Sequence, residues 1–148
     1  MKTNIYKKCG IVCVLCLFFF LSIFLFVRKN IFHERFGNME NEMTSLDQLR
    51  DESNVYYIKF WADYCGWCTK MEGDWNQLKD KYHDTIVNGK RVKIYQISHE
   101  NPLAKMFPQK YNYSIEGFPT ILKLSGEKIE SYERSRNFES LSAYVNEQ

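Results

Sequence analysis

The chain has 148 residues, of which 45% are hydrophobic and 16% aromatic, so it is long enough for one domain with an apolar core. Its 20 Lys and Arg and its 18 Asp and Glu are spread along the sequence, which gives no support for a nucleic-acid surface. Three of the five cysteines lie in an apolar N-terminal run, which excludes a disulfide-stapled scaffold for the remainder.

Residues 9–27 follow a short N-terminal tail, residues 1–8, and contain no charged side chain. At about 1.5 Å per residue this run matches the thickness of the hydrocarbon core, which predicts one transmembrane helix in contact with membrane lipid. A cleaved signal peptide is the competing interpretation, but its apolar region would be shorter and would end at small residues. The cysteines at positions 9, 13 and 16 share one face of this helix, where they pack, or where Cys9 is acylated.

The orientation of this span is not decided by charge, because basic residues flank both of its ends. A first span so close to the N-terminus usually acts as a signal anchor with a cytoplasmic N-terminus. We therefore expect a single-pass membrane protein whose soluble domain is lumenal or extracytoplasmic. There the triplet Asn112-Tyr113-Ser114 would be a glycosylation acceptor. Residues 28–42 are polar and charged, and are expected to form a tether.

Residues 43–148 have the periodic patterns of a folded domain. Thr44 or Ser45 is expected to cap a first short helix, because a leucine pair with helical spacing follows. Residues 55–61 are almost continuously apolar and aromatic, as in a central strand that is covered on both faces. Lys59 is the exception in this strand.

A second helix is expected to begin at Cys65. Apolar residues follow at spacings of three and four on one face: Cys68, Met71, Trp75, Leu78 and Tyr82. Gly73 falls inside this helix and should weaken or bend it locally. After a polar loop at residues 88–90, residues 92–97 form the next predicted strand.

The last third of the chain predicts a helix, a hairpin and a closing helix. Asn101-Pro102 fits an N-cap followed by proline at the first helical position, and Pro108 should end or kink this helix early. Residues 118–124 and 128–132 are strands joined by a tight turn at Ser125-Gly126. The final helix has an apolar face made of Phe138, Leu141, Tyr144 and Val145. Alternating helices and strands followed by a hairpin predict an α/β fold with a central mixed β-sheet flanked by helices.

The residues with the clearest chemistry are Cys65 and Cys68, which lie where a strand is expected to end and a helix to begin. The unpaired N–H groups and the macrodipole at a helix N-terminus favour a thiolate. Two cysteines separated by two residues, next to such a strand and helix, indicate a redox pair. We therefore expect Cys65 to be the nucleophile and Cys68, one turn further along, to be its resolving partner.

From Met43 to Gln148 the chain resembles the thioredoxin superfamily, and in particular the domains of thioredoxins and protein disulfide isomerases. The resemblance rests on Phe60-Trp61-Ala62 leading into Cys65-Gly66-Trp67-Cys68, and on Gly117-Phe118-Pro119-Thr120 in the place of the family's cis-proline loop. It implies the thioredoxin fold, with a short first strand near residues 38–43 and a redox-active disulfide.

The resemblance also implies how a substrate would bind. The Phe118–Pro119 peptide bond would be cis and would face the two cysteines. Gly117 and Phe118 would pair through their backbone with an extended substrate segment, which gives affinity with little side-chain specificity. Gly66 and Trp67, between the cysteines, would belong to the same substrate-binding region.

Lys59 departs from the family pattern, because a buried acid usually stands six residues before the first cysteine. A neutral Lys59 would relay a proton, whereas a charged one would stabilise a thiolate and make the pair more oxidising. A third interpretation is that its stem packs in the sheet and its amine reaches solvent. Tyr64 replaces the tryptophan that commonly precedes the motif, and Gly73 stands where proline is common.

The direction of electron transfer is not indicated by the motif. The Gly66-Trp67 pair matches neither the Gly-Pro typical of reducing thioredoxins nor the Gly-His typical of the isomerases. Isomerase domains often have an arginine after the hairpin that approaches the active site. Arg136 is the nearest match to this arginine. The alternative interpretation is that Arg136 is a solvated surface residue.

The resemblance thus implies a membrane-anchored thiol-disulfide oxidoreductase that acts on protein substrates, is reset by a further redox partner and needs no cofactor or metal. The alternative is a non-enzymatic peptide-binding or assembly module with an inert disulfide. A zinc site is a third interpretation. It would need two further ligands from His33, His83 and His99, which stand at no recognisable spacing.

Overall fold

The computed structural model describes residues 19–24 and 43–147. The chain divides into two units, Met1–Glu40 and Asn41–Gln148. In the first unit residues 19–24 are helical, whereas the rest of the predicted span 9–27, the tail 1–8 and the tether 28–42 lie outside the described residues. Among the described residues, none of the helices has the length and apolar character needed to cross a membrane.

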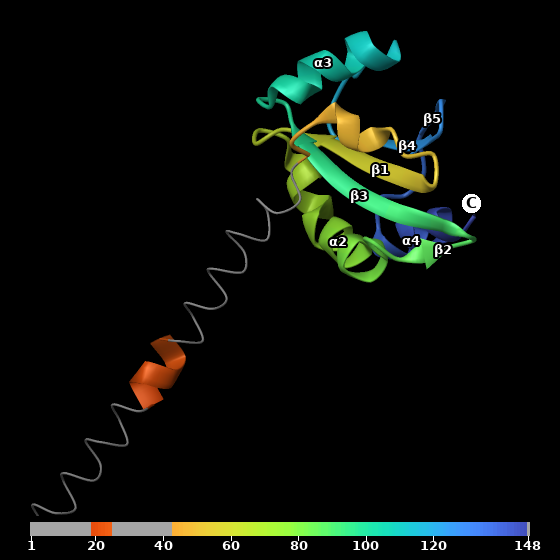
Figure 1. Cartoon of the computed structure of the whole chain (residues 1–148). Coiled ribbons are helices and arrows are strands. Elements are labelled where there is room, and N and C mark those ends of the chain that lie inside the picture. The colour runs from red at the N-terminus through yellow and green to blue at the C-terminus, as the bar shows by residue number, and fades with distance from the viewer. Residues whose placement is uncertain (1–18, 25–42, 148) are drawn as a thin grey trace, which may run out of the picture. The chain divides into compact units, whose positions relative to one another are not determined.

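The second unit is built on a five-stranded mixed sheet with the strand order β2-β3-β1-β4-β5 (Figure 1). The strands are β1 (Asn54–Trp61), β2 (Ile86–Val87), β3 (Lys90–Ser98), β4 (Thr120–Ser125) and β5 (Lys128–Ser131). β1 pairs in parallel with β3 and antiparallel with β4. It is therefore the central strand, as its almost continuously apolar sequence predicts.

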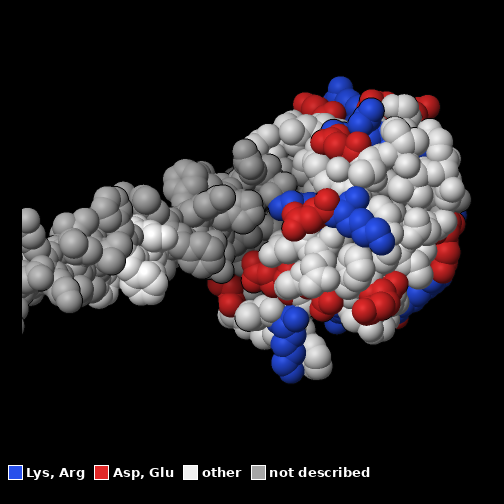
Figure 2. Space-filling model, turned by 90° about the horizontal axis from the view of Figure 1, so that it is seen from below, with Lys and Arg blue, Asp and Glu red and all other residues white. Residues whose placement is uncertain are grey.

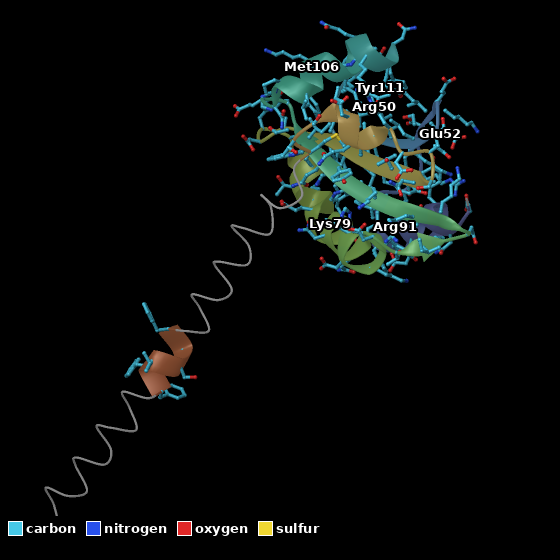
Figure 3. All side chains as sticks on the ribbon, in the orientation of Figure 1. Arg50, Glu52, Lys79, Arg91, Met106 and Tyr111 are labelled. Carbon is cyan, nitrogen blue, oxygen red and sulfur yellow. A yellow bond between two sulfur atoms is a disulfide. The ribbon has the colours of Figure 1, made fainter. Side chains whose placement is uncertain are left out.

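Helices cover both faces of this sheet (Figure 1). The helices of this unit are η1 (Leu46–Leu49, a 3-10 helix), α2 (Gly66–Tyr82), α3 (Pro102–Tyr111) and α4 (Phe138–Asn146). α2 and α4 pack on one face, and η1 and α3 pack on the other. Figure 3 shows this arrangement, with Met106 and Tyr111 of α3 on the opposite side of the sheet from Lys79 of α2. The expected mixed sheet flanked by helices is confirmed.

The side chains on the two faces of β1 belong to two separate apolar cores, because successive side chains of a strand point in opposite directions. Tyr57 packs on the α2 side with Trp75, within a core that also includes α4. Phe60 packs on the α3 side, where its ring lies 5.0 Å from that of Phe107. Charged side chains are confined largely to the surface, where Figure 2 shows acidic and basic groups interspersed on the face in view.

The first predicted helix is a single turn of 3-10 helix. Ser45 is its N-cap, as predicted, and its Oγ accepts a hydrogen bond of 3.1 Å from the backbone N–H of Asp47. The short strand expected near residues 38–43 lies outside the described residues except for Met43. The N–H of Met43 donates to the carbonyl oxygen of Gln96 in β3 at 3.2 Å.

Helix α3 does not end at Pro108, so the first of the two predicted alternatives, an end or a kink at this proline, is wrong. The proline lies inside the helix, which continues to Tyr111. Two contacts stabilise the extra turn. The ring of Tyr111 packs 4.6 Å from that of Phe107, and Asn112 caps the helix in a left-handed conformation, with its N–H donating to the carbonyl of Pro108. Tertiary packing and this cap therefore outweigh the lost proline N–H. α2 likewise continues through Gly73.

β2 was not predicted, because it contains only two residues within a segment that reads as a polar loop. Asn88 and Gly89 both have positive φ angles, 48° and 82°, and connect β2 to β3 as a tight hairpin. Asparagine and glycine adopt such angles with little strain, so the Asn-Gly pair was the available signal for this hairpin.

One prediction concerns the contact between α2 and α4. The carboxylate of Asp74 in α2 accepts a hydrogen bond of 3.0 Å from the backbone N–H of Phe138, the first residue of α4. No intrahelical partner exists for that N–H. We expect Asp74→Ala to lower the free energy of unfolding by about 1 kcal/mol in urea denaturation. Asp80→Ala, an exposed position of the same helix, is the matched control. Equal losses in the two variants would contradict this role.

Candidate active site

Cys65 and Cys68 form a disulfide at the start of α2, directly after the end of β1. Their Cα atoms lie 5.2 Å apart. Cys65 is the N-cap residue of α2, and its Sγ accepts a hydrogen bond of 3.1 Å from the backbone N–H of Cys68. Both residues are largely buried, with 9% and 5% exposed. The sulfur of Cys65 therefore lies where helix N–H groups and the macrodipole favour negative charge.

The predicted docking loop lies next to this disulfide. Ala62, Cys65 and Cys68 form a small buried cluster, against which Trp61 and Phe118 pack. The Phe118–Pro119 peptide bond is cis, as the resemblance implies. The side chain of Thr120 donates a hydrogen bond of 2.7 Å to the carbonyl of Gly117. The structure thus brings together two motifs that are about fifty residues apart in the sequence.

Two large aromatic side chains beside the disulfide are exposed. Trp67, between the cysteines, is 65% exposed, and Lys70 lies over its ring at 4.4 Å from the centroid. Tyr64, just before Cys65, is 75% exposed. Its ring lies 5.0 Å from that of His99 and 6.4 Å from that of Phe118. We refer to Tyr64, His99 and Phe118 as the aromatic cluster.

Lys59 is buried in β1, with 2% of the residue exposed. Its Nζ lies 5.4 Å from the centroid of the Trp75 ring, on the α2 side of the sheet. Burial lowers the pKa of Lys59 from 10.5 to about 8, and the charge of Glu72 opposes this shift. Near pH 7 the amine is therefore still protonated in about nine-tenths of the molecules. The interpretation in which this amine reaches solvent is not supported by its burial.

Arg136 lies at the cis-proline loop. Its Nη2 donates a hydrogen bond of 3.3 Å to the carbonyl oxygen of Pro119. A shallow pocket of about 240 Å³ lies between this loop and the segment after β5, lined by residues 117–121, 131–133 and 136. Arg136 is exposed, but it is not merely solvated, because it contacts the loop that the resemblance assigns to substrate.

The residues suggested for zinc are not brought together in the described part of the chain. His83 lies at the C-terminal end of α2, whereas Cys65 is at its N-terminal end. Its Nδ1 accepts a hydrogen bond of 2.9 Å from the backbone N–H of Ile94. His33 lies outside the described residues. Within those residues no three His, Cys, Asp or Glu side chains gather as a metal site.

His99 is the residue near the disulfide that sequence reasoning considered only as a zinc ligand. It directly follows β3, which runs parallel to β1, and its backbone N–H donates to the carbonyl of Trp61 at 2.8 Å. Neighbouring parallel strands end at the same edge of a sheet, so a parallel pairing of the strands predicted at residues 55–61 and 92–97 would have placed the residues that follow them side by side. That rule was the available signal for His99.

Comparisons with known proteins agree with this geometry. A family model described as Thioredoxin matches residues 39–147. The chain is 34% identical to the Thioredoxin domain-containing protein 5 homolog of Drosophila melanogaster, over 62% of this chain and 21% of that protein. It is 33% identical to Protein disulfide-isomerase 1 of Dictyostelium discoideum, over 66% of this chain and 26% of that protein. The chain therefore spans between a fifth and about a quarter of the length of these relatives.

Solved structures show the same fold. The J-Trx1 fragment of ERdj5 superposes with a TM-score of 0.56 at 16% identity, covering 72% of this chain and 48% of that one. Human ERp44 in form II superposes with a TM-score of 0.57 at 16% identity, covering 72% of this chain and 29% of that one. At such identity these two likenesses show the fold alone. The family match over residues 39–147 shows that the chain belongs to the thioredoxin family.

Proposed function

We propose that this protein is a thiol-disulfide oxidoreductase that exchanges disulfides with protein substrates and is anchored in a membrane by residues 9–27. The observation that carries the proposal is the position of the Cys65–Cys68 disulfide at the N-terminus of α2. Relatives named as protein disulfide isomerases support protein thiols and disulfides as the substrate class. The length and apolar character of residues 9–27 support the anchor, with the domain on the lumenal or extracytoplasmic side.

The disulfide is poorly suited to a purely structural role. It links two positions three residues apart, within the first turn of one helix. It therefore ties no two elements of the fold together, and the described domain is held by its two apolar cores. The alternative function, a peptide-binding module with an inert disulfide, gives this disulfide no structural task, because it joins no two elements of the fold.

The chemistry follows from the location of the two sulfurs. In the reductive direction the Cys65 thiolate attacks one sulfur of a substrate disulfide, and the other substrate sulfur leaves as a thiolate and takes up a proton. Cys68 then loses its proton and attacks Cys65, which releases the second substrate thiol and re-forms the Cys65–Cys68 disulfide. The helix N-terminus stabilises the Cys65 thiolate, both as attacking group and as leaving group. In the oxidative direction the same steps run backwards.

Substrate binding is assigned to the loop at residues 117–119 and the exposed aromatic residues beside it. Backbone groups of Gly117 and Phe118 would pair with an extended peptide. Tyr64 and Trp67 flank the nucleophile in the sequence and expose large apolar surface, which suits side chains of an unfolded polypeptide. These contacts favour a flexible protein segment over a small-molecule thiol.

We assign to Lys59 the role of adjusting the reduction potential of the Cys65–Cys68 pair. It is buried on the side of β1 that faces α2, two residues before Trp61, which packs on the cysteine cluster. Because its amine is mostly protonated near pH 7, it favours a thiolate in the reduced pair and therefore makes the pair more oxidising. The interpretation of Lys59 as a neutral proton relay applies only above its pKa of about 8.

The test of the proposed function is covalent trapping with the full-length Cys68→Ala variant. Without the resolving thiol, Cys65 remains joined to its substrate, so we expect protein adducts on non-reducing gels that disappear on reduction. The captured proteins would identify the substrates, and their compartment would identify the side of the membrane.

The double variant Cys65→Ala/Cys68→Ala is the control, because it keeps Cys9, Cys13 and Cys16 and so reports any adducts that arise from them. Adducts of equal abundance in the two variants, or none in either at normal expression, would refute the oxidoreductase and leave the peptide-binding module as the better explanation.

A further inference from the structure

Two buried side-chain nitrogen atoms in the described part of the chain lack a hydrogen-bond partner, and both lie beside the disulfide. They are Nε1 of Trp61 and Nδ1 of His99. The two residues lie side by side at the ends of β1 and β3, joined by the hydrogen bond from the His99 N–H to the Trp61 carbonyl. An unpaired buried polar atom destabilises the folded state. Their occurrence at this edge of the sheet calls for a functional explanation.

The two atoms differ in what they can do. The indole N–H of Trp61 can only donate a hydrogen bond. The imidazole of His99 can both accept and donate a proton, which is the property that general acid-base catalysis requires. Between the two cysteines Gly66 and Trp67 provide no such group.

His99 contacts both the residue that precedes the nucleophile and the docking loop. Its ring is 5.0 Å from that of Tyr64, the residue before Cys65, and 6.0 Å from that of Phe118. Phe118 in turn packs on the cluster that contains Cys65 and Cys68. A substrate sulfur joined to Cys65, with its chain lying along the docking loop, is therefore held on the side of the disulfide where the imidazole lies.

Other titratable groups around His99 do not take this position. Tyr64 contacts the ring directly, but this residue is 75% exposed. Phe118 contributes no titratable group. Asp63, Glu100 and Glu116 stand on the neighbouring segments and are exposed. Lys59 lies in the core between the sheet and α2.

We propose that His99 transfers the proton that moves between sulfurs when the mixed disulfide is resolved, a role that rests on the proposed function. The imidazole accepts the proton of the Cys68 thiol as Cys68 attacks Cys65. The bond between Cys65 and the substrate sulfur breaks, its electron pair leaves with the substrate sulfur, and the imidazolium returns the proton to that sulfur. The two cysteines end oxidised, the substrate ends as a dithiol, and no further reactant is needed.

The experiment compares full-length wild type, His99→Gln and His99→Ala in detergent. Each protein is reduced beforehand and mixed with a peptide that contains one disulfide, and the rate constant of peptide reduction is measured from pH 5.5 to 9. We expect His99→Gln to be slower at pH 7 by roughly tenfold to a hundredfold, and to change the dependence of the rate constant on pH. Added imidazole should restore part of the rate in His99→Ala.

His83→Gln is the matched control, because His83 lies at the far end of α2. It should keep the wild-type rate, pH profile and insensitivity to imidazole. A wild-type pH profile in His99→Gln would overturn the role of His99 while leaving the proposed function intact. So would a rate loss in His99→Ala that imidazole does not restore, because it would indicate packing alone. A wild type that reduces no peptide would overturn both proposals.

Discussion

Replacing Cys65 with serine will abolish disulfide exchange by the full-length protein. A serine hydroxyl is not ionised near neutral pH and cannot form a mixed disulfide, so no covalent intermediate exists. We expect the rate constant for reduction of a peptide disulfide to fall by at least roughly a thousandfold, which corresponds to about 4 kcal/mol in the barrier. The measurement uses pre-reduced protein and a single turnover.

Cys68→Ser provides the comparison that separates nucleophile from resolving thiol. It should still react once with the peptide and stop at the mixed disulfide, because Cys65 keeps its place at the N-terminus of α2. The reverse outcome, with covalent adducts in Cys65→Ser and none in Cys68→Ser, would mean that the two roles are exchanged. Both variants should remain folded, since neither sulfur connects separate elements.

Lys59→Met will stabilise the domain at neutral pH and remove a pH dependence of its stability. The folded-state pKa of Lys59, about 8, lies below its ordinary value of 10.5. Between these two pH values the unfolded chain binds a proton that the folded chain does not, so stability rises as the pH rises through this window. As the pH falls through about 8 this contribution is lost. The shift corresponds to about 3 kcal/mol, the cost of burying the charge.

Urea denaturation of oxidised wild type and Lys59→Met at pH 7, 9 and 10.5 measures this effect, after the free thiols are alkylated. The gap in unfolding free energy between the variant and wild type should be about 1–3 kcal/mol at pH 7 and should shrink as the pH rises to 10.5. Lys105→Met, at an exposed position of α3, is the control and should show no such trend. A gap that does not change with pH would contradict the buried charge.

The same variant tests how Lys59 acts on the redox pair. Without the buried cation the thiolate loses a stabilising charge, so the Cys65–Cys68 pair should become more reducing. A change of 1.4 kcal/mol corresponds to about 30 mV in a two-electron couple, so we expect a shift of tens of millivolts in a glutathione titration. Lys59→Glu should shift the potential further in the same direction.

The sequence predicted the elements that combine a strong pattern with local signals. β1 and α2 were recognised from an apolar run and from one apolar stripe. The N-cap Asn101 was recognised from the proline that follows it, and in the structure its side chain accepts a hydrogen bond from the N–H of Leu103. Such features depend on neighbours in the chain, which is why they could be read before any tertiary contact was known.

Features that depend on distant contacts could not be predicted. The extension of α3 past Pro108 requires the packing of Tyr111 against Phe107. Burial of Lys59 follows from the position of β1 at the centre of the sheet, and no local signal distinguishes it from a lysine that reaches solvent. The approach of Arg136 to the Pro119 carbonyl likewise depends on how the hairpin folds back.

The chemical pair of the site was recognised because its signal lies within four residues, whereas the surroundings are assembled from three parts of the chain. Cys65 and Cys68 stand in one motif. The aromatic cluster joins the end of β1, the end of β3 and the cis-proline loop. The pairing of β1 with β3 and with β4 brings these segments together, and His99 has no local signal of its own.

The two residues between the cysteines, Gly66 and Trp67, belong to neither apolar core. A Cβ atom added at Gly66 would have no close neighbour outside its own stretch of chain, and Trp67 is 65% exposed. Substitutions at these two positions therefore leave both cores untouched. The reduction potential of the cysteine pair can therefore change through residues on which folding does not depend. The direction of electron transfer can diverge in evolution while the fold stays constant.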